Sequence, residues 1–421
     1  MRTYRSSGRE GGRRFADAAL SLLLLAGFAG CDSLLDVRNP GSVDADDLDN
    51  PQLALTQLNS ALGQWECAFV NYVVASATVS GELINASNWA PINPYARRQD
   101  GLLTSLGSCP NARDSNAMGA YAPLHQARYL AEDSYQRIEA FPDASVPRKS
   151  ETLGLLQAHA GYATLLLGEG WCETAFDQGP LQTRAQAFAR AEERFTRAIA
   201  LAQQAGNQDL RHMATLGRAR ARLNLDNLEG AATDAAQIPA GFRWEAEYST
   251  ISGRRENRVY NMHNLMRYIG VNFMTYRDLK IGDVADPRVT IVDAKRFGQS
   301  GNTPMWDQTK YPAPDSPIPV ATWEEAQLII AEARPAETVA AINRLRRAQD
   351  LPDYTPSGNR IADILEERRR QLFLEGHRLN DMLRHKVPFA TGRDHQGQQL
   401  GEHTCLPLPD QERLNNPNIG G

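Results

Sequence analysis

Residues 361–386 read IADILEERRRQLFLEGHRLNDMLRHK, and this stretch decides the fold more than any other part of the sequence. Its acidic side chains stand three or four residues from arginines, which is the spacing of neighbouring side chains on one face of a helix. We expect a charged helix whose carboxylates are held in ion pairs. The three expected pairs are Glu366 with Arg370, Glu375 with Arg378, and Asp381 with Arg384.

The same carboxylates raise the possibility of a glycoside hydrolase, because hydrolysis of a glycosidic bond uses two carboxyl groups that flank it. An arginine partner, however, lowers the pKa of a carboxyl group, which suits an ion pair and not a general acid. The sequence has no HExxH, GxSxG, Walker or GxGxxG motif, and His377 is interpreted as a packed histidine. We therefore predict a binding protein with no catalytic residue and no cofactor. The carboxylates considered are Glu366, Glu367, Glu375 and Asp381.

Upstream of this stretch, three pairs of helices are expected. Ala191, Phe195 and Ala198 form a ridge of small, large and small side chains, as in the second helix of a tetratricopeptide unit. Small residues allow the two helices of such a unit to approach closely. An unrelated helical bundle is the alternative. The expected pairs are 151–167 with 185–204, 210–225 with 228–238, and 323–333 with 335–348.

These helices predict an all-α protein with one folded domain at 51–421. Residues 82–110 lack helical periodicity and are expected to form a long loop. Aromatic residues crowd the insertion after residue 242, where we expect short helices and a hairpin near 288–297. The expected parts are a helical scaffold at about 51–240 and 320–390, a loop-rich insertion at about 242–319, and a C-terminal tail at 391–421.

At the N-terminus, residues 13–31 read RRFADAALSLLLLAGFAGC. The apolar run is too short to span a bilayer and follows five arginines, so residues 1–30 are interpreted as a signal peptide. The ending Ala29-Gly30-Cys31 resembles the bacterial lipobox, which predicts a lipidated Cys31 and a tether over 31–50. An ordinary secretory signal cut nearby is the alternative, and in both cases the chain leaves the cytoplasm.

The charge balance excludes one class of partner. The chain has 45 basic and 50 acidic side chains, and residues 1–30 hold five arginines, Glu10 and Asp17, which leaves 40 basic and 48 acidic. Because nucleic-acid binding needs a basic face, no nucleic acid is expected as a partner. No later apolar stretch approaches the length of a membrane span, so lipid on Cys31 would be the anchor.

Four cysteines remain besides Cys31, and an even number in an exported protein favours disulfides. Several pairings are possible, and the sequence does not choose among them. We favour Cys67–Cys109, within one aromatic-rich region, and Cys172–Cys405, which would fasten the tail to the helical core. No two cysteines have CxxC spacing, so no metal site is expected.

With its flanks, the opening stretch resembles the SusD/RagB family of outer-membrane nutrient-uptake lipoproteins. The resemblance covers the chain from Cys31 onwards. Two departures from the family are the shorter length of this chain and its extra cysteines. The matching pieces in the stretch are 367–369, 372–378, Asp381 and Arg384; those outside it are LLDV at 34–37 with Asn39-Pro40, IAEA at 330–333 before Ala340, Ile342, Asn343, Leu345 and Arg346, and LPLP at 406–409 before Glu412 and Asn416-Pro417-Asn418.

The resemblance implies a mainly helical SusD-like fold with tetratricopeptide-type pairs. It implies a lid over a SusC-type TonB-dependent transporter, which captures oligosaccharides or peptides at the cell surface and closes them into the barrel. Its location would be the bacterial outer membrane, with lipid on Cys31 as the anchor. A tetratricopeptide-type envelope adaptor is the alternative function, and a glycoside hydrolase is a more distant one.

A sugar presents apolar C–H faces flanked by hydroxyl groups, so its binding site needs flat aromatic faces beside amide and guanidinium donors. The alternative is that such aromatic residues cap the helical core. We favour Trp89 as a binding residue, because Pro91, Pro94 and the neighbouring asparagines favour its exposure. The candidate residues are Asn88, Trp89, Asn93, Tyr95 and Arg98 in the expected loop, and Trp306 with Tyr311 in the insertion.

Overall fold

The computed structural model describes residues 45–99, 107–109 and 119–419. The signal peptide expected at 1–30, the lipidated Cys31 and the tether up to residue 44 lie outside these described residues. Contacts between residues divide the chain after Asn50, and the described part of the first unit holds a short 3-10 helix, η1 (Ala45–Asp49). The elements that follow all belong to the second unit, which begins at Pro51.

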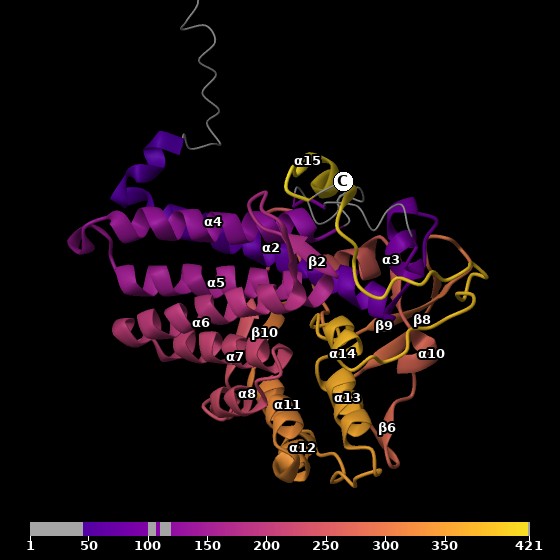
Figure 1. Ribbon diagram of the computed structural model, residues 1–421. Coiled ribbons are helices and arrows are strands. Elements are labelled where there is room, and N and C mark those ends of the chain that lie inside the picture. The colour runs from indigo at the N-terminus through magenta and orange to yellow at the C-terminus, as the bar shows by residue number, and fades with distance from the viewer. Residues whose placement is uncertain (1–44, 100–106, 110–118, 420–421) are drawn as a thin grey trace, which may run out of the picture. The chain divides into compact units, whose positions relative to one another are not determined.

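The second unit is mainly helical, as predicted, and its long helices pack against one another in sequence order (Figure 1). The expected pairs are present as α5 with α6, α7 with α8, and α11 with α12, and α11 also packs on α7 and α8. Their bounds are α2 (Ala54–Ser80), α4 (Tyr121–Ala140), α5 (Lys149–Gly170), α6 (Arg184–Ala205), α7 (Gln208–Asn224), α8 (Leu228–Ala235), α11 (Trp323–Ala333) and α12 (Thr338–Arg347), with single 3-10 turns at η2 (Pro51–Leu53), η4 (Asp143–Ser145) and η6 (Pro335–Glu337).

Close packing in this row depends on Phe195 of α6. Its ring lies against glycines of both neighbouring helices: a Cβ on Gly161 of α5 would come within 2.8 Å of the ring, and a Cβ on Gly217 of α7 within 2.4 Å. Ala191 and Ala198 on the same face of α6 are fully buried. The ridge identified in the sequence thus inserts one phenyl ring between two helices that carry no side chain at that point.

The strands are short and pair in twos, always antiparallel. Most lie in the expected insertion, where the short helices α9 (Arg258–Tyr260), η5 (Asn261–Leu265) and α10 (Phe273–Tyr276) separate them. The hairpin expected near 288–297 is longer than predicted, because those residues supply only its first strand. The pairs are β1 (Leu83–Asn85) with β5 (Ile269–Val271), β2 (Glu173–Ala175) with β3 (Leu181–Thr183), β4 (Arg243–Ala246) with β10 (Ile318–Thr322), β6 (Lys280–Ile281) with β7 (Val284–Ala285), and β8 (Ile291–Phe297) with β9 (Pro304–Gln308).

The prediction of one long loop over 82–110 is wrong for the part of it that the structure describes. This segment contains β1, η3 (Ala90–Ile92) and α3 (Asn93–Arg97). β1 pairs with β5, with Leu83 opposite Val271, so its partner comes from the insertion. A three-residue strand with so distant a partner leaves no periodicity in the local sequence, which explains the error.

The stretch that opened the sequence analysis forms α13 (Arg360–Gln371) and α14 (Arg378–Arg384). Two of its expected ion pairs are present. Glu366 lies 2.7 Å from Arg370, and Asp381 lies 3.6 Å from Arg384. The arginines lower the pKa of Glu366 although its partial burial opposes them, as the ion-pair interpretation requires.

The third expected pair, Glu375 with Arg378, is wrong. Glu375 lies 2.6 Å from the Lys310 ammonium group instead, and burial raises the pKa of its carboxyl group. Leu374 and Gly376 both have positive φ, 56° and 85°, so the helix ends before Glu375. The three-residue spacing therefore no longer places Glu375 and Arg378 on one helical face.

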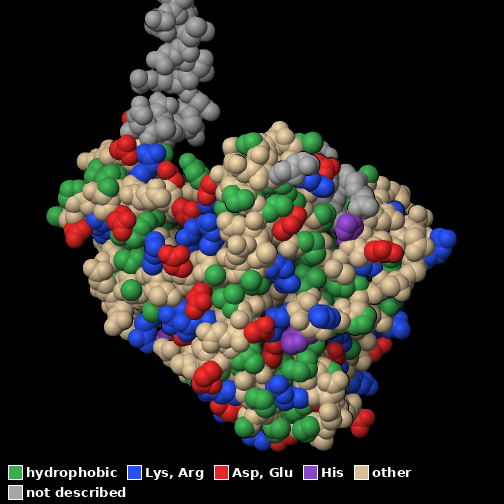
Figure 2. Space-filling model, in the orientation of Figure 1, with side chains coloured by type: hydrophobic (Ala, Val, Ile, Leu, Met, Phe, Trp, Pro, Cys, Tyr) green, Lys and Arg blue, Asp and Glu red, His purple; other side chains and the backbone are tan. Residues whose placement is uncertain are grey.

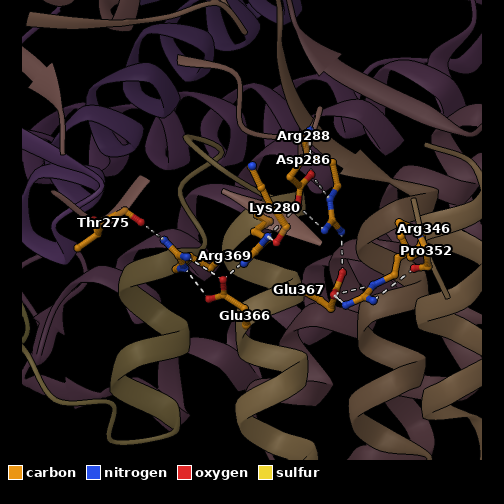
Figure 3. A network of polar contacts seen from close by, with 10 residues as sticks. Thr275, Lys280, Asp286, Arg288, Arg346, Pro352, Glu366, Glu367 and Arg369 are labelled. Carbon is orange, nitrogen blue, oxygen red and sulfur yellow. Dashed lines mark hydrogen bonds and ion pairs between the residues drawn. The ribbon is translucent and has the colours of Figure 1, made fainter. Parts of the chain in front are cut away.

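A buried network joins α13 to the insertion and to α12 (Figure 3). Glu367 accepts hydrogen bonds from Arg288 at 2.6 Å and from Nε of Arg346 at 2.9 Å. Arg288 also pairs with Asp286 at 2.7 Å. Glu367 is thus the connection between three segments that lie far apart in the sequence, and not a solvent-facing carboxylate.

Disulfides join Cys67 to Cys109 and Cys172 to Cys405, with Cα–Cα distances of 6.0 and 5.2 Å, and these are the pairs favoured above. The second disulfide fastens the end of α5 to the C-terminal tail, beside a parallel bridge between Trp171 and Leu406. The tail also contains a short helix, α15 (Asp410–Asn415). None of the helices described is long and apolar enough to cross a bilayer.

Candidate functional site

A cavity of about 380 Å³ lies where the end of α2, the strand β1, the helix α10 and the C-terminal tail meet. α2 ends there because Gly81 adopts a left-handed conformation with φ 79°, which turns the chain into β1. The residues that line the cavity come from 78–85, from Ala96 and Arg98, from Asn272 and Met274, and from the tail between Phe389 and Leu400.

The β8–β9 hairpin packs on the segment that follows β1. Gly298 lies so close to Ala86 that a Cβ on it would come within 2.2 Å of the Ala86 carbonyl oxygen. The N–H of Ser300 donates to that oxygen at 3.0 Å, and the N–H of Asn88 donates to Oε1 of Gln299 at 2.9 Å. The turn of the hairpin is therefore fixed to residues 86–88, which directly follow the cavity-lining Asn85.

Trp89, the favoured candidate, follows these residues and is half-buried. Its ring stacks on Tyr268 with 5.1 Å between ring centroids and 27° between ring planes. Asn88 beside it is exposed, whereas Asn93 is half-buried and accepts a hydrogen bond from Asn85 at 2.7 Å. Asn88 and Trp89 are thus accessible together, and Asn93 is used to hold the segment after β1.

Trp306 of β9 is also half-buried. Its ring stacks on Phe273 of α10 with 6.3 Å between centroids, and the Arg277 guanidinium lies 5.4 Å above the ring. Phe273 precedes Met274, whose side chain is 59% exposed and lines the cavity. Trp306 is therefore connected to the wall of the cavity through α10.

Tyr95 and Tyr311 lie in the core and not on a surface. They are 2% and 1% exposed, and burial raises the pKa of both phenols. The Tyr311 hydroxyl donates to the Leu374 carbonyl oxygen at 3.0 Å. For these two tyrosines the core-capping alternative describes the geometry, and Trp306 and Tyr311 do not form a joint cluster on the surface.

Arg98 is buried as well, but it lines the cavity. Its guanidinium donates to the carbonyl oxygens of His403, at 3.1 Å, and of Ala390, and lies 5.2 Å above the Phe389 ring. It therefore ties the end of α3 to the C-terminal tail. Its role in the structure is to hold the tail against the cavity.

Two ionisable side chains of the cavity, His395 and Asp394, can form hydrogen bonds with a ligand. Burial lowers the pKa of His395, so its imidazole is neutral at neutral pH, and its Nε2 lies 3.2 Å from Oγ1 of Thr303. Asp394 lies 3.3 Å from Arg97. A neutral imidazole and a paired carboxylate offer hydrogen bonds to a ligand.

Sequence reasoning missed Asn272, Met274 and the tail residues of the cavity. They come from segments far apart in the chain, and no local pattern marks them as neighbours. The four carboxylates considered for hydrolysis are absent from the lining of the cavity. Within the ranges described, no group of three or more His, Cys, Asp and Glu side chains could hold a metal ion.

Several solved structures share this fold. A SusD-like carbohydrate-binding protein from Bacteroides vulgatus matches with a TM-score of 0.59 over 88% of this chain and 97% of its own, at 12% identity. A laminarin-binding SusD-like protein matches with a TM-score of 0.64 over 88% and 98%, at 14% identity. A SusD superfamily protein from Bacteroides fragilis gives 0.64 over 88% and 99%, at 12% identity.

No family model and no curated protein matches the sequence. The structural matches nevertheless extend over most of this chain and nearly all of each solved chain. The chain therefore has the SusD-like fold that the opening stretch predicted.

Proposed function

We propose that the chain is a carbohydrate-binding lipoprotein of the SusD/RagB family and that it binds oligosaccharides at the cavity beside β1. The observation that carries the proposal is the SusD-like fold, which the chain shares over 88% of its length with structures described as carbohydrate-binding and laminarin-binding. The resemblance of residues 361–386 to the same family supports it from the sequence. A binding protein of this kind performs no hydrolysis.

The segments that continue from the cavity-lining Asn85 and Met274 carry the chemistry that an oligosaccharide needs. Trp89 on Tyr268 and Trp306 on Phe273 are half-exposed aromatic pairs, and exposed aromatic rings suit the apolar C–H faces of sugars. Asn88 is exposed beside Trp89 and offers both a donor and an acceptor to hydroxyl groups. Because the tryptophans are already stacked on a neighbour, little side-chain entropy is lost when a ligand binds.

Calorimetry with a panel of glycans and peptides tests the proposal. Trp89→Ala and Trp306→Ala are expected to weaken binding of the best glycan by about 1–3 kcal/mol each while moving the melting temperature little. Trp323→Ala is the matched control, because Trp323 is also half-buried but packs on Leu328, Leu345 and Leu372 of the helical core. Unchanged affinity with a large loss of stability in Trp89→Ala would place this side chain in the core. Binding of peptides and of no glycan would contradict the proposed ligand class.

We further propose that lipid on Cys31 anchors the chain to the outer membrane, facing the cell exterior, where it closes over a SusC-type TonB-dependent transporter. Several acyl chains give stable attachment, so Cys31→Ser is expected to leave the membrane fraction. A TonB-dependent receptor is expected to co-purify with the wild-type protein in mild detergent. Full membrane partition of the Ser variant would contradict the lipid anchor. Co-purification of other envelope proteins without such a receptor would favour the adaptor function.

A further inference from the structure

A second cavity, of about 450 Å³, adjoins the first. The two share the residues at the end of α2 and at the start of α10, so they form one groove. The first cavity contributes the apolar side chains of Met274 and Phe389, and the second contributes Thr275 and Tyr276. The shared residues are Ser80, Gly81, Asn272 and Ala390.

The charge of this groove is opposite to that of the chain. The sequence has a net charge of −5, and Figure 2 shows basic and acidic side chains interspersed over the face that it presents. In the groove, by contrast, the only carboxylate among the described lining residues is Asp394, which is paired with Arg97. Four arginines line it: Arg98, Arg369, Arg378 and Arg393.

Arg378 is the arginine of this groove that the fold leaves without a partner. Its expected partner, Glu375, is taken by Lys310, and Arg378 makes no hydrogen bond or ion pair with any residue that the structure describes. The other arginines of the block are all paired: Arg368 with Asp381, Arg369 and Arg370 with Glu366, and Arg384 with Glu332.

A buried carboxylate that interacts with Arg378, that of Glu82, does not fully neutralise it. Glu82 is 1% exposed, and its Oε1 accepts a hydrogen bond from the Leu374 N–H at 3.1 Å. Burial raises its pKa to about 7, while the charges of Arg378 and Lys310 lower it. Near neutral pH a large share of Glu82 is therefore protonated, and the positive charge of Arg378 remains available to a ligand.

Arg393 provides a second free cation in the first cavity. It is exposed, and it donates to the Gly397 carbonyl oxygen at 2.6 Å. No carboxylate within the described residues pairs with it. A ligand that fills both cavities would thus meet one available guanidinium in each, together with the apolar and hydroxyl-bearing side chains of their linings.

We propose that this groove selects acidic oligosaccharides, and that Arg378 and Arg393 bind the carboxylates of uronic acid units. The inference rests on the proposed function and narrows its ligand class. Guanidinium groups bind carboxylates through two parallel charge-assisted hydrogen bonds, which gives both affinity and orientation. A neutral glycan in the same place would leave Arg378 without a counter-charge in a partly desolvated groove.

Paired probes test this inference. Tetrameric oligouronates of galacturonic, mannuronic and glucuronic acid are compared by calorimetry with their carboxyl-reduced, neutral forms, so that chain length and linkage stay the same. At least one oligouronate is expected to bind about tenfold or more tightly than its neutral form. Raising the salt concentration is expected to weaken binding of the oligouronate and to leave binding of the neutral form unchanged.

Arg378→Gln is expected to remove most of this preference for the oligouronate, and Arg393→Gln part of it. Arg378→Lys keeps the charge without the two-pronged donor and is expected to lie in between. Arg197→Gln is the control, because Arg197 lies on the exposed face of α6 and pairs only with Glu193 among the described residues. The melting temperature of each variant shows that it is folded.

Three results would overturn the inference. If neutral forms bind as tightly as every oligouronate, the groove does not select acidic glycans, while the proposed function stands. If Arg378→Gln weakens binding of both forms equally, the arginine does not contact a carboxylate. If acidic peptides bind and no glycan does, the proposed function fails together with the inference.

Discussion

Glu367 shows at the scale of a single residue what the closely spaced charges of α13 do. It is 2% exposed and accepts hydrogen bonds from Arg288 and Arg346 (Figure 3). Glu367→Gln leaves the buried Arg346 without a carboxylate and leaves Arg288 with Asp286 alone, so we expect a loss of about 3–5 kcal/mol in the free energy of unfolding, measured by urea denaturation at neutral pH.

Its neighbour provides the control for this prediction. The Glu366 side chain also pairs with two arginines, but it is 40% exposed, and solvent screens its charge. Glu366→Gln is therefore expected to cost about 1 kcal/mol or less. Equal losses in the two variants would show that burial does not decide the contribution of these ion pairs.

The raised pKa of the Glu82 carboxyl group predicts that the free energy of unfolding depends on pH. Burial raises its pKa from the ordinary 4.5 to about 7, and its Oε2 is buried without a hydrogen-bond partner among the described residues. A carboxyl group whose pKa is raised by folding stabilises the protein below pH 4.5, and this contribution is lost as the pH rises through 7. Gln at this position keeps the acceptor for the Leu374 N–H and does not titrate.

The free energy of unfolding of the wild type, measured relative to Glu82→Gln, is therefore expected to fall by about 3 kcal/mol between pH 4.5 and pH 8. Denaturant titrations of both proteins over this range measure it. The comparison cancels the opposite effects of carboxylates such as Glu332 and Asp286, whose pKa values are lowered by arginines. A difference that does not change with pH would show that Glu82 is not buried as described.

At the scale of the helix, two glycines distinguish the effect of side-chain packing on stability from the effect of helix propensity. A Cβ at Gly217 of α7 would lie 2.4 Å from the Phe195 ring, whereas the atom nearest to a Cβ at Gly63 of α2 is 3.9 Å away. Gly217→Ala is expected to destabilise by about 1–3 kcal/mol through overpacking. Gly63→Ala is expected to stabilise by about 0.5–1 kcal/mol, because alanine favours the helix. Thermal unfolding of both variants is the measurement, and destabilisation of similar size in both would contradict the packing argument.

The same local packing explains why the helices could be predicted. The ridge at Ala191, Phe195 and Ala198 and the glycines opposite it lie within helices whose side-chain period is visible in the sequence. The pairing of β1 with β5 could not be predicted, because it joins distant segments through three residues each. The left-handed conformation of Leu374 was equally hidden, since a leucine carries no signal for it, and it removed the expected pairing of Glu375.

The candidate site could be predicted in part for a similar reason. The segment after α2 does border the main cavity, and Trp89 in this segment is half-buried, not fully buried. Tyr95 and Tyr311 are equally aromatic and polar, but their burial depends on what packs over them, which the sequence does not show. The tail that closes the cavity is brought there by the tertiary fold alone.

At the scale of the whole molecule, the Cys172–Cys405 disulfide connects the helical core to the binding groove. It holds the tail to the end of α5, and the preceding tail residues between Phe389 and Leu400 line the cavity. The Cys67–Cys109 disulfide instead joins α2 to residues 107–109, none of which lines either cavity. The two disulfides are therefore expected to differ in their effect on ligand binding.

Removal of either disulfide increases the number of conformations that the unfolded chain can adopt. The increase is larger for the disulfide that closes the longer loop. The bonded cysteines are 233 and 42 residues apart, so the chain-entropy model gives losses of about 5 kcal/mol for Cys172→Ser with Cys405→Ser and about 4 kcal/mol for Cys67→Ser with Cys109→Ser. Guanidinium denaturation measures both.

At a temperature where both variants are folded, ligand affinity is expected to fall several-fold in the first variant alone, because its tail is less firmly held against the groove. Equal affinity in the two variants would show that contacts such as those of Arg98 to the carbonyl oxygens of Ala390 and His403 hold the tail without the disulfide.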